Sequence, residues 1–230
     1  MLSMIVGGAL AAPPGEANAP ASALAEAYGI EGWGNIERID FTFNVDLPGK
    51  DETVSRAWTW WPKQGKVRQR FPSSNGEPIT FKRNVVAKDA SEAVRQADKQ
   101  FINDHYWLLF PFQPVWSNPA VRDEGGASLP IGEGEARKLV VQYPSEGGYT
   151  PGDAYWLYLN DENRIVQWQY LPDGNADKAM AHTWEKHRKL GPIVVSLEHW
   201  GPNKKFHLWF TDVKAKLVSG ETVTPEPFDN

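Results

Sequence analysis

Alternation of apolar and polar residues dominates the chain after Trp33 and predicts β-strands. Between residues 39 and 46, isoleucine, phenylalanine and valine alternate with threonine, asparagine and aspartate. Because successive side chains of a strand point to opposite faces, this period of two indicates a half-buried strand. Similar patterns predict further strands at residues 54–61, 66–71, 79–84, 137–143, 153–159, 164–171, 181–189, 193–200 and 205–218.

Polar segments rich in proline, glycine and asparagine separate these strands and predict turns. Residues 160–163 join two strands as a hairpin, in which Asn163 suits a left-handed backbone conformation. Residues 201–203, Gly-Pro-Asn, predict a second tight turn. Residues 118–135 are rich in glycine, and we expect a linker or flexible loop there.

The period changes to that of a helix in one stretch of the chain. Asp89 is a good N-cap, and Glu92 follows three residues later, as in a capping box. Alanine and valine then recur at helical spacing up to Phe101, which predicts one amphipathic helix of about 14 residues. Residues 101–112 are very apolar and include proline, so we expect a short helical turn followed by an extended buried segment.

These elements predict a mainly β fold of the α+β class. The strands form a strongly curved antiparallel sheet, a half-barrel, and the one main helix covers it. With 230 residues, the chain is long enough for a single β domain with a large core. We assign residues 28–219 to one curved-sheet domain and residues 220–230, which are acidic and contain proline, to a flexible tail.

The first residues of the chain are small and apolar and resemble the latter part of a signal peptide. Candidate cleavage motifs lie at residues 9–11 and 17–19, although no lysine or arginine precedes the apolar run. A tail rich in alanine, proline and glycine is the alternative interpretation. Both interpretations place residues 1–27 outside the fold, and the first predicts export to the periplasm or secretion.

Charge and cysteine content exclude several classes of function. The net charge is −5, and the most basic run, at residues 63–70, alternates with other residues, so we expect no nucleic-acid partner. The chain has no cysteine, which excludes disulfides, thiolate metal sites and cysteine nucleophiles. Its apolar runs are too short to span a bilayer, so we expect no transmembrane span.

Tryptophan is unusually frequent, with 11 copies. A large aromatic side chain carries roughly 150–250 Å² of surface, and exposed apolar patches on soluble monomers seldom exceed about 300–600 Å². Only about two or three such rings therefore fit together on an open surface. The others lie in the core or line a concave cavity.

Strand periodicity places several aromatic residues on shared faces. Trp58 and Trp60 share one face of a strand. Trp168 and Tyr170 point to the interior, because glutamines occupy the other face of their strand. These rings form either a plain aromatic core or the lining of a ligand cavity. The residues assigned to such a cavity are Trp58, Trp60, Phe101, Tyr106, Trp107, Trp156, Tyr158, Trp168, Tyr170 and Trp209.

Polar residues that interrupt apolar stretches are the candidates for catalytic or metal-binding residues. Asn103, Asp104 and His105 lie in such a stretch, and because buried polar groups need hydrogen bonds we expect a structural role for them. An acid–base role for Asp104 with His105 is the alternative, which needs a geometry that adjacent residues rarely give. His199 and His207 flank a turn, where a metal site with a nearby carboxylate is the alternative to ordinary strand histidines. Common catalytic and phosphate-binding motifs are missing, and we predict no catalytic residue, metal or cofactor.

The order of elements carries a resemblance to a known family. The segments concerned lie at residues 101–112, 155–160, 166–168, 183–185, 191–193 and 210–213. Together with the apolar N-terminus and the single helical insertion between meandering strands, they resemble the half-barrel of periplasmic lipoprotein carriers, the LolA-like proteins, over residues 33–218. The resemblance implies a concave β surface, covered by a helix, that holds acyl chains or another hydrophobic ligand. The carriers are less rich in tryptophan, and no residue known to act in lipoprotein handover is matched.

We therefore predict an exported, non-enzymatic protein that binds a hydrophobic ligand, with a lipid, an acyl chain or a lipoprotein as its partner. A carbohydrate-binding module that uses exposed tryptophan and tyrosine rings is an alternative. A hydrolase is a further alternative, although no pair among the 29 acidic residues is singled out by the sequence.

Overall fold

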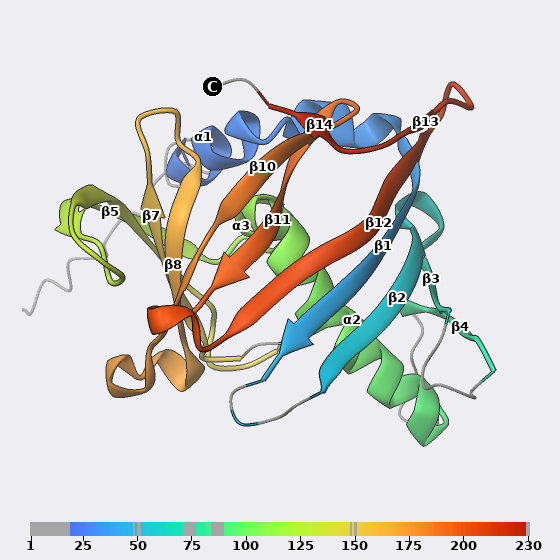
Figure 1. Cartoon of the computed structure of the whole chain (residues 1–230), viewed down its shortest axis with the longest axis horizontal. Coiled ribbons are helices and arrows are strands. Elements are labelled where there is room, and N and C mark those ends of the chain that lie inside the picture. The colour runs from blue at the N-terminus through green and yellow to red at the C-terminus, as the bar shows by residue number, and fades with distance from the viewer. Residues whose placement is uncertain are drawn as a thin grey trace, which may run out of the picture.

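The computed structural model describes residues 19–47, 49, 52–70, 77–83, 90–147, 149 and 151–228. The described chain forms two antiparallel sheets that bend around one long helical segment (Figure 1). The larger sheet contains, in spatial order, β14 (Glu226–Pro227), β10 (Glu185–Leu190), β11 (Ile193–Trp200), β12 (His207–Leu217), β1 (Ile36–Asp46), β2 (Thr53–Trp61), β3 (Lys66–Gln69) and β4 (Ile79–Lys82), and β13 (Thr222–Val223) pairs with β12. The smaller sheet contains β5 (Ala120–Ser128), β6 (Glu135–Gln142), β7 (Ala154–Leu159), β8 (Ile165–Leu171) and β9 (Met180–Thr183). The α-helices are α1 (Ala19–Ala27), α2 (Glu92–Leu109) and α3 (Gln113–Ser117).

The expected fold class is confirmed. Over the described residues the fold is mainly β, every strand pairing is antiparallel, and neither sheet closes on itself. One main helical segment, α2, lies behind the larger sheet in the view of Figure 1. The curved wall is divided into two hydrogen-bonded sheets, where one continuous sheet was expected.

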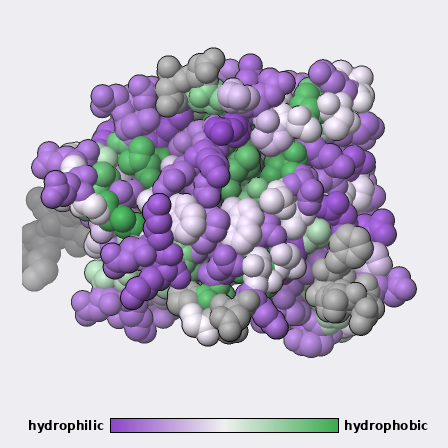
Figure 2. Space-filling view, in the orientation of Figure 1, coloured by the Kyte–Doolittle hydropathy of each residue, from purple (hydrophilic) through white to green (hydrophobic). Residues whose placement is uncertain are grey.

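β1 shows how the apolar pattern builds the larger sheet. Ile39, Phe41 and Phe43 are buried, as the alternation predicts. The backbone register places Phe43 opposite Phe210 of β12 and Arg56 of β2, so these three side chains share the face toward α2. The outward face of the same sheet is mainly hydrophilic (Figure 2).

The segment expected as one strand at residues 181–189 is two strands in different sheets. β9 pairs with β8, β10 pairs with β11, and Trp184 stands between them. The Trp184 ring packs against Trp168 and His199 with ring centroids 5.3 and 4.7 Å away, and its backbone nitrogen donates to the carbonyl of Val166 at 2.8 Å. The chain therefore passes between sheets at a buried tryptophan, which an alternating pattern does not reveal.

α2 begins later than predicted. Its N-cap is Ser91, whose hydroxyl accepts a hydrogen bond from the backbone nitrogen of Val94 at 3.3 Å. Asp89, the expected N-cap, lies outside the described residues. A serine three residues before the bonded amide satisfies one of the free N–H groups of the first turn, which is the usual role of an N-cap.

α2 also ends later than predicted, so the expectation of an extended segment within residues 101–112 is wrong. The helix runs to Leu109, and a 3₁₀ turn at Phe110–Phe112 leads directly into α3. Pro111 lies in the first turn of the 3₁₀ helix, and Pro114 lies in the first turn of α3. At these positions the missing N–H breaks no helical hydrogen bond. Both sheets contact this stretch, so its apolar residues lie on more than one side and hide its helical period.

The N-terminal boundary of the fold differs from the prediction. α1 lies within residues 1–27, which were expected outside the fold, and it buries Leu24 and Ala25 in the core. The predicted cleavage motif at residues 9–11 lies outside the described residues. A short helix whose one apolar side meets the core has too weak a pattern to be separated from a signal-like sequence.

The C-terminal boundary also differs, and so does one internal loop. Within residues 220–230, β13 pairs with β12 and β14 pairs with β10, so this segment is not a loose tail up to Pro227. Residues 118–135 contain β5, which pairs with β6. The register shifts between Asp123 and Gly125, where the glycine adopts a φ of 76°. Gly125 thus lies at a bulge in a strand, whereas Gly132 and Gly134 lie in the connection between β5 and β6.

Two predicted turns are confirmed. Asn163, in the β7–β8 hairpin, has a φ of 59°, and Asn203, between β11 and β12, has a φ of 56°. Asparagine tolerates this left-handed region because its short side chain hydrogen-bonds locally. The hairpin turn fixes which β7 and β8 residues share a face, and these strands form one wall of the candidate site.

Candidate functional site

The face of α2 toward the larger sheet is filled with side chains. Phe101 packs against Trp58 and Trp60 with ring centroids 5.4 and 5.5 Å away. Asp104 is fully buried on this face and accepts hydrogen bonds from Arg56 Nε at 2.7 Å and Trp58 Nε1 at 2.8 Å. Burial raises the pKa of the Asp104 carboxyl, and the hydrogen bond from Arg56 opposes this shift. Asp104 thus ties α2 to β2.

Another side of α2 borders two adjoining depressions of about 370 and 270 Å³. Ile102, Tyr106 and Tyr149 line both of them, so the two are neighbours, and we call them together the α2 groove. The first depression is also lined by Trp60, His105, Gln113, Trp116 and Tyr143. The second is also lined by Trp107, Asp153, Tyr155, Trp168 and Tyr170.

Helix spacing and strand register bring these residues together. Ile102 and Tyr106 are four residues apart and therefore lie one above the other on α2. Tyr155 of β7 lies directly opposite Tyr170 of β8, and their rings stack with centroids 5.2 Å apart. Trp168 lies two residues before Tyr170 and faces the same way. An aromatic helix face and an aromatic strand face thus meet beside the groove, and both contribute to its lining.

A neutral histidine lies in the wall of the first depression. His105 Nδ1 lies 2.7 Å from the carbonyl oxygen of Phe101, so this nitrogen carries the proton and donates it. His105 Nε2 then accepts a hydrogen bond from Gln113 Nε2 at 3.1 Å. Burial lowers the pKa of His105 to about 3, with the positive charge of Arg83 acting in the same direction. Both ring nitrogens are therefore engaged in a neutral imidazole.

The acid of the second depression is also fully engaged. Asp153 Oδ2 accepts a hydrogen bond from the Tyr170 hydroxyl at 2.9 Å. Asp153 Oδ1 accepts from the backbone nitrogen of Asp173, also at 2.9 Å. Burial raises the pKa of the Tyr170 hydroxyl, and the Asp153 carboxylate raises it further. The polar groups at this end of the groove are thus held in place by one another.

Tyrosine hydroxyls supply the remaining polar points of the lining. Burial raises the pKa of Tyr143 and raises that of Tyr155 well above its ordinary value. Both hydroxyls therefore stay neutral, and the Tyr143 oxygen accepts a hydrogen bond from the Ser117 hydroxyl at 3.2 Å. A mainly apolar lining with a few fixed polar groups is typical of small-molecule sites.

The entrance of the groove combines an exposed ring with charges of both signs. The Tyr149 side chain is 52% exposed, and the Arg83 guanidinium lies 5.2 Å from its ring centroid. Arg83 and Glu146 border the first depression, and Lys99 borders the second. Charged groups thus lie at the rim and aromatic groups form the walls.

The structure brings five of the ten predicted site residues together. Those that line the α2 groove are Trp60, Tyr106, Trp107, Trp168 and Tyr170. Trp58 and Phe101 lie in the adjacent core between α2 and the larger sheet, where they are fully buried.

Two predicted residues of β7 lie on the other face of the smaller sheet. Trp156 lies opposite Gln169, and Tyr158 lies opposite Gln167. The Lys138 ammonium sits 3.6 Å from the Trp156 ring centroid, and the Tyr158 hydroxyl donates to Gln169 Oε1 at 2.7 Å. Both side chains therefore point away from the α2 groove.

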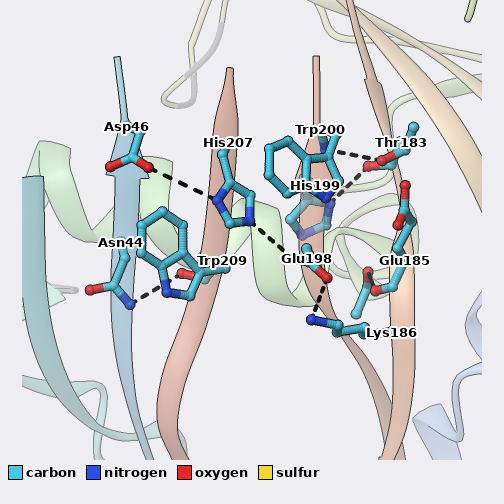
Figure 3. A network of polar contacts seen from close by, with 11 residues as sticks. Asn44, Asp46, Thr183, Glu185, Lys186, Glu198, His199, Trp200, His207 and Trp209 are labelled. Atoms are coloured by element: carbon cyan, nitrogen blue, oxygen red, sulfur yellow. Dashed lines mark hydrogen bonds and ion pairs between the residues drawn. The ribbon is translucent and has the colours of Figure 1, made fainter. Parts of the chain in front are cut away.

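Trp209, the tenth predicted residue, lies on the outward face of the larger sheet (Figure 3). It stacks on His207 with ring centroids 4.3 Å apart, and His207 stacks on Trp200 at 3.6 Å. Glu198 Oε1 lies 3.0 Å from His207 Nε2, and its other oxygen lies 2.5 Å from Lys186 Nζ. Figure 3 shows this row of rings in front of the strands, with the helix behind them.

Sequence reasoning missed Ile102, Trp116, Tyr143, Tyr149 and Tyr155. The sequence does contain a signal for Tyr155. The turn at residues 160–163 sets the hairpin register, and this register places Tyr155 opposite Tyr170, on the face that Trp168 also occupies. Tyr149 and Trp116 come from segments outside any alternating pattern, so only the three-dimensional structure places them at the groove.

The histidines of the described residues do not gather into a metal site. Within these ranges, no group of three or more His, Asp or Glu side chains is arranged to hold a metal ion. His199 is fully buried and His207 points outward, so the two histidines that flank the β11–β12 turn lie on opposite faces. His187 Nε2 accepts a hydrogen bond from the Tyr28 hydroxyl at 2.8 Å.

Comparison with known proteins shows structural similarity to nine solved chains, two of which are described below. The chain matches no protein-family model, and no curated protein is significantly similar to it. It is similar to a LolA superfamily protein from Nitrosomonas europaea, with 9% sequence identity, a TM-score of 0.49 and coverage of 86% of this chain and 92% of that chain. It is also similar to a "putative outer membrane lipoprotein-sorting protein domain" from Vibrio parahaemolyticus, with 9% identity, a TM-score of 0.45 and coverage of 86% and 91%. Among the described helices, none has the length and apolarity that crossing a membrane requires.

Proposed function

We propose that the protein binds a hydrophobic ligand, the acyl chain of a lipid or lipoprotein, in the α2 groove. The observation that carries this proposal is that Ile102, Tyr106 and Tyr149 line two neighbouring aromatic depressions. A groove formed by two depressions in a row suits an extended chain better than a compact ligand. Export of the protein remains a prediction from its N-terminal residues, which lie outside the described ranges.

The chemistry of the walls supports apolar binding. Each methylene that leaves water for such a surface contributes about 0.8 kcal/mol, so several methylenes in contact with rings provide most of the affinity. The Trp107 and Trp168 rings already pack against each other, with centroids 4.7 Å apart, so little side-chain freedom is lost on binding. The charges of Arg83 and Lys99 at the rim are placed to meet a polar end group.

The titratable groups of the groove favour binding over catalysis. A general acid or base needs a proton that it can exchange near the working pH. His105 is neutral with both nitrogens engaged, and Asp153 is held by Tyr170 and a backbone nitrogen. The hydrogen bonds of His105 and Asp153 therefore hold the lining side chains in position.

The proposal is tested by titrating the protein with dansyl-labelled undecanoic acid and following the dansyl fluorescence. Tyr149→Ser removes an exposed ring from both depressions and is expected to weaken binding about tenfold, the loss that burying less apolar surface produces. Ile102→Trp fills the junction of the depressions and is expected to abolish binding.

Val218→Ser is the matched control, because Val218 is 53% exposed and lies away from the α2 groove. This variant is expected to bind the probe like the unmodified protein. Probe binding that survives Ile102→Trp, or that falls equally in the Tyr149 and Val218 variants, contradicts the proposal.

A further inference from the structure

A basic hollow lies on the outward face of the larger sheet, the face turned away from α2. Strand pairing assembles it: Lys214 of β12 lies opposite Asp40 of β1, which lies opposite Thr59 of β2, which lies opposite Arg68 of β3. Neighbouring strands are about 4.8 Å apart, so these side chains stand in one row across four strands. Arg38 and Arg70 complete the hollow, which has a volume of about 410 Å³.

Positive charge in this hollow is in excess. Its four cations are Arg38, Arg68, Arg70 and Lys214, and Asp40 is its acid. The Asp40 carboxylate is already occupied, because Arg38 Nε donates to it at 3.0 Å and the Thr59 hydroxyl donates to it at 2.5 Å. Over the described part of the chain, no ion pair engages the side chains of Arg68, Arg70 or Lys214.

Arg70 is the residue that distinguishes the hollow from an ordinary charged surface. Its backbone nitrogen continues the β2–β3 pairing by donating to the carbonyl of Ala57 at 2.8 Å, which directs its side chain to the outward face. Its Nε and Nη2 atoms are buried and have no hydrogen-bond partner among the described residues. Arg70 as a residue is half-buried, so its charge is reachable from the hollow while two of its nitrogens lack an acceptor. An oxyanion that enters the hollow therefore meets a guanidinium whose charge and donors are not compensated, which favours binding.

The walls of the hollow define the class of anion. Guanidinium groups match tetrahedral oxyanions through paired N–H donors, and three uncompensated cations favour a group with more than one negative charge. The Trp61 ring also lines the hollow, and Lys66 Nζ lies 4.0 Å from its centroid. A hollow of this volume is wider than a lone oxyanion requires and has room for the atoms attached to it.

We propose that this hollow is a binding site for a phosphoryl group, contacted by Arg68, Arg70 and Lys214. The phosphoryl group comes either from a phospholipid headgroup or from free phosphate. The site is separate from the α2 groove, because the larger sheet lies between them. The most basic run of the sequence, residues 63–70, supplies only part of this charge, and the rest comes from β1 and β12 through strand pairing.

Two binding measurements on the full chain test the proposal. The first is calorimetric titration with inorganic phosphate. The second is cosedimentation with vesicles of phosphatidylglycerol, with phosphatidylcholine vesicles and added inorganic phosphate as comparisons. Binding of phosphate together with phosphate-sensitive sedimentation on phosphatidylglycerol identifies a lipid headgroup. Binding of phosphate without sedimentation on either vesicle identifies a soluble source of the same phosphoryl chemistry.

Variants separate a built site from diffuse charge. Arg70→Gln is expected to weaken phosphate binding at least about tenfold, the effect of losing one charge-assisted hydrogen bond. Arg68→Gln, at an exposed position, tests the same site with little effect on folding. Lys186→Gln removes an equal charge from the outward face at a lysine that pairs with Glu198, and it is expected to change binding less than about twofold.

The proposal is overturned if neither phosphate nor phosphatidylglycerol vesicles bind. It is also overturned if Arg68→Gln and Lys186→Gln reduce binding equally, because the attraction then depends on net charge alone. Loss of phosphate binding with intact binding of the dansyl probe separates this site from the α2 groove.

Discussion

At the scale of single residues, Asp104 is a buried charged group that connects α2 to β2. It is fully buried and accepts hydrogen bonds from Arg56 Nε, Arg56 Nη2, Trp58 Nε1 and Asn103 Nδ2. Four donors around one carboxylate offset the cost of removing it from water. The sequence predicted a structural role for Asp104 from its apolar surroundings, but its partners on β2 are distant in the chain.

Asp104→Asn is expected to lower the free energy of unfolding by about 3–5 kcal/mol, because it leaves the Arg56 charge buried without a partner. Urea unfolding measures the change. Glu37→Gln is the control: it breaks the Lys216–Glu37 pair, whose side chains are both more than a third exposed, and costs less than about 1 kcal/mol. Equal losses in the two variants contradict the role assigned to Asp104.

Buried histidines make stability depend on pH. Burial lowers the pKa of His105 and of His199 to about 3, below the ordinary value of 6.5. Between these values the unfolded chain binds protons that the folded chain does not bind. The stabilisation is therefore complete above pH 6.5 and is lost as the pH falls.

Denaturant unfolding at several pH values between 5 and 7.5 is expected to show a falling free energy of unfolding below pH 6.5. Each such histidine contributes a slope that approaches about 1.4 kcal/mol per pH unit. His105→Asn removes one titrating group and is expected to make the slope shallower. Stability that is independent of pH over this range is the contradicting result.

At the scale of elements, the alternating pattern predicted most strands. Its predictions were wrong where one stretch of chain pairs first with a strand of one sheet and then with a strand of the other. The pattern at residues 181–189 is continuous, yet Trp184 divides it between two sheets. Periodicity reports which face of a strand is apolar and does not report which strand lies beside it. For the same reason the basic hollow, which needs side chains from β1, β3 and β12, was invisible in the sequence.

α1 shows the corresponding limit for helices. It has no capping signal strong enough to predict it, and its place in the fold comes from Leu24 and Ala25, which the core of distant strands covers. Tyr28, just after it, donates to His187 and accepts from the Ile165 backbone nitrogen at 3.1 Å. Tertiary contacts of this kind define the boundary of the fold.

Leu24→Ala is expected to lower the free energy of unfolding by about 2–4 kcal/mol, since it deletes a fully buried side chain and leaves a cavity. Glu26→Ala, on the exposed side of the same helix, is expected to change it by less than about 0.5 kcal/mol. Thermal or urea unfolding checks both values. A small effect of Leu24→Ala shows that α1 is not part of the cooperative core.

At the scale of the whole molecule, the larger sheet separates two surfaces of different chemistry. One side carries α2 (Figure 1), and the other side is mainly hydrophilic (Figure 2). The aromatic groove lies beside α2, and the basic hollow lies on the hydrophilic side. The tryptophans are divided among the groove, the outward face and the core. The sequence predicted that most of them are buried or line a cavity, but only the structure assigns each one to its place. Of the five predicted site residues that reach the groove, four lie on α2 and β8, which face each other, and the fifth, Trp60, lies on β2.

The most direct test of the groove is quenching of tryptophan fluorescence by methyl dibromostearate, a neutral acyl chain whose bromine atoms quench the rings that lie close to them. Trp107 lines the groove and Trp209 lies on the outward face, and both are half-buried. We predict that Trp107→Phe lowers the fraction of fluorescence that is quenched, whereas Trp209→Phe does not lower it. Quenching that is unchanged in Trp107→Phe, or reduced in Trp209→Phe, contradicts the placement of an acyl chain in the α2 groove.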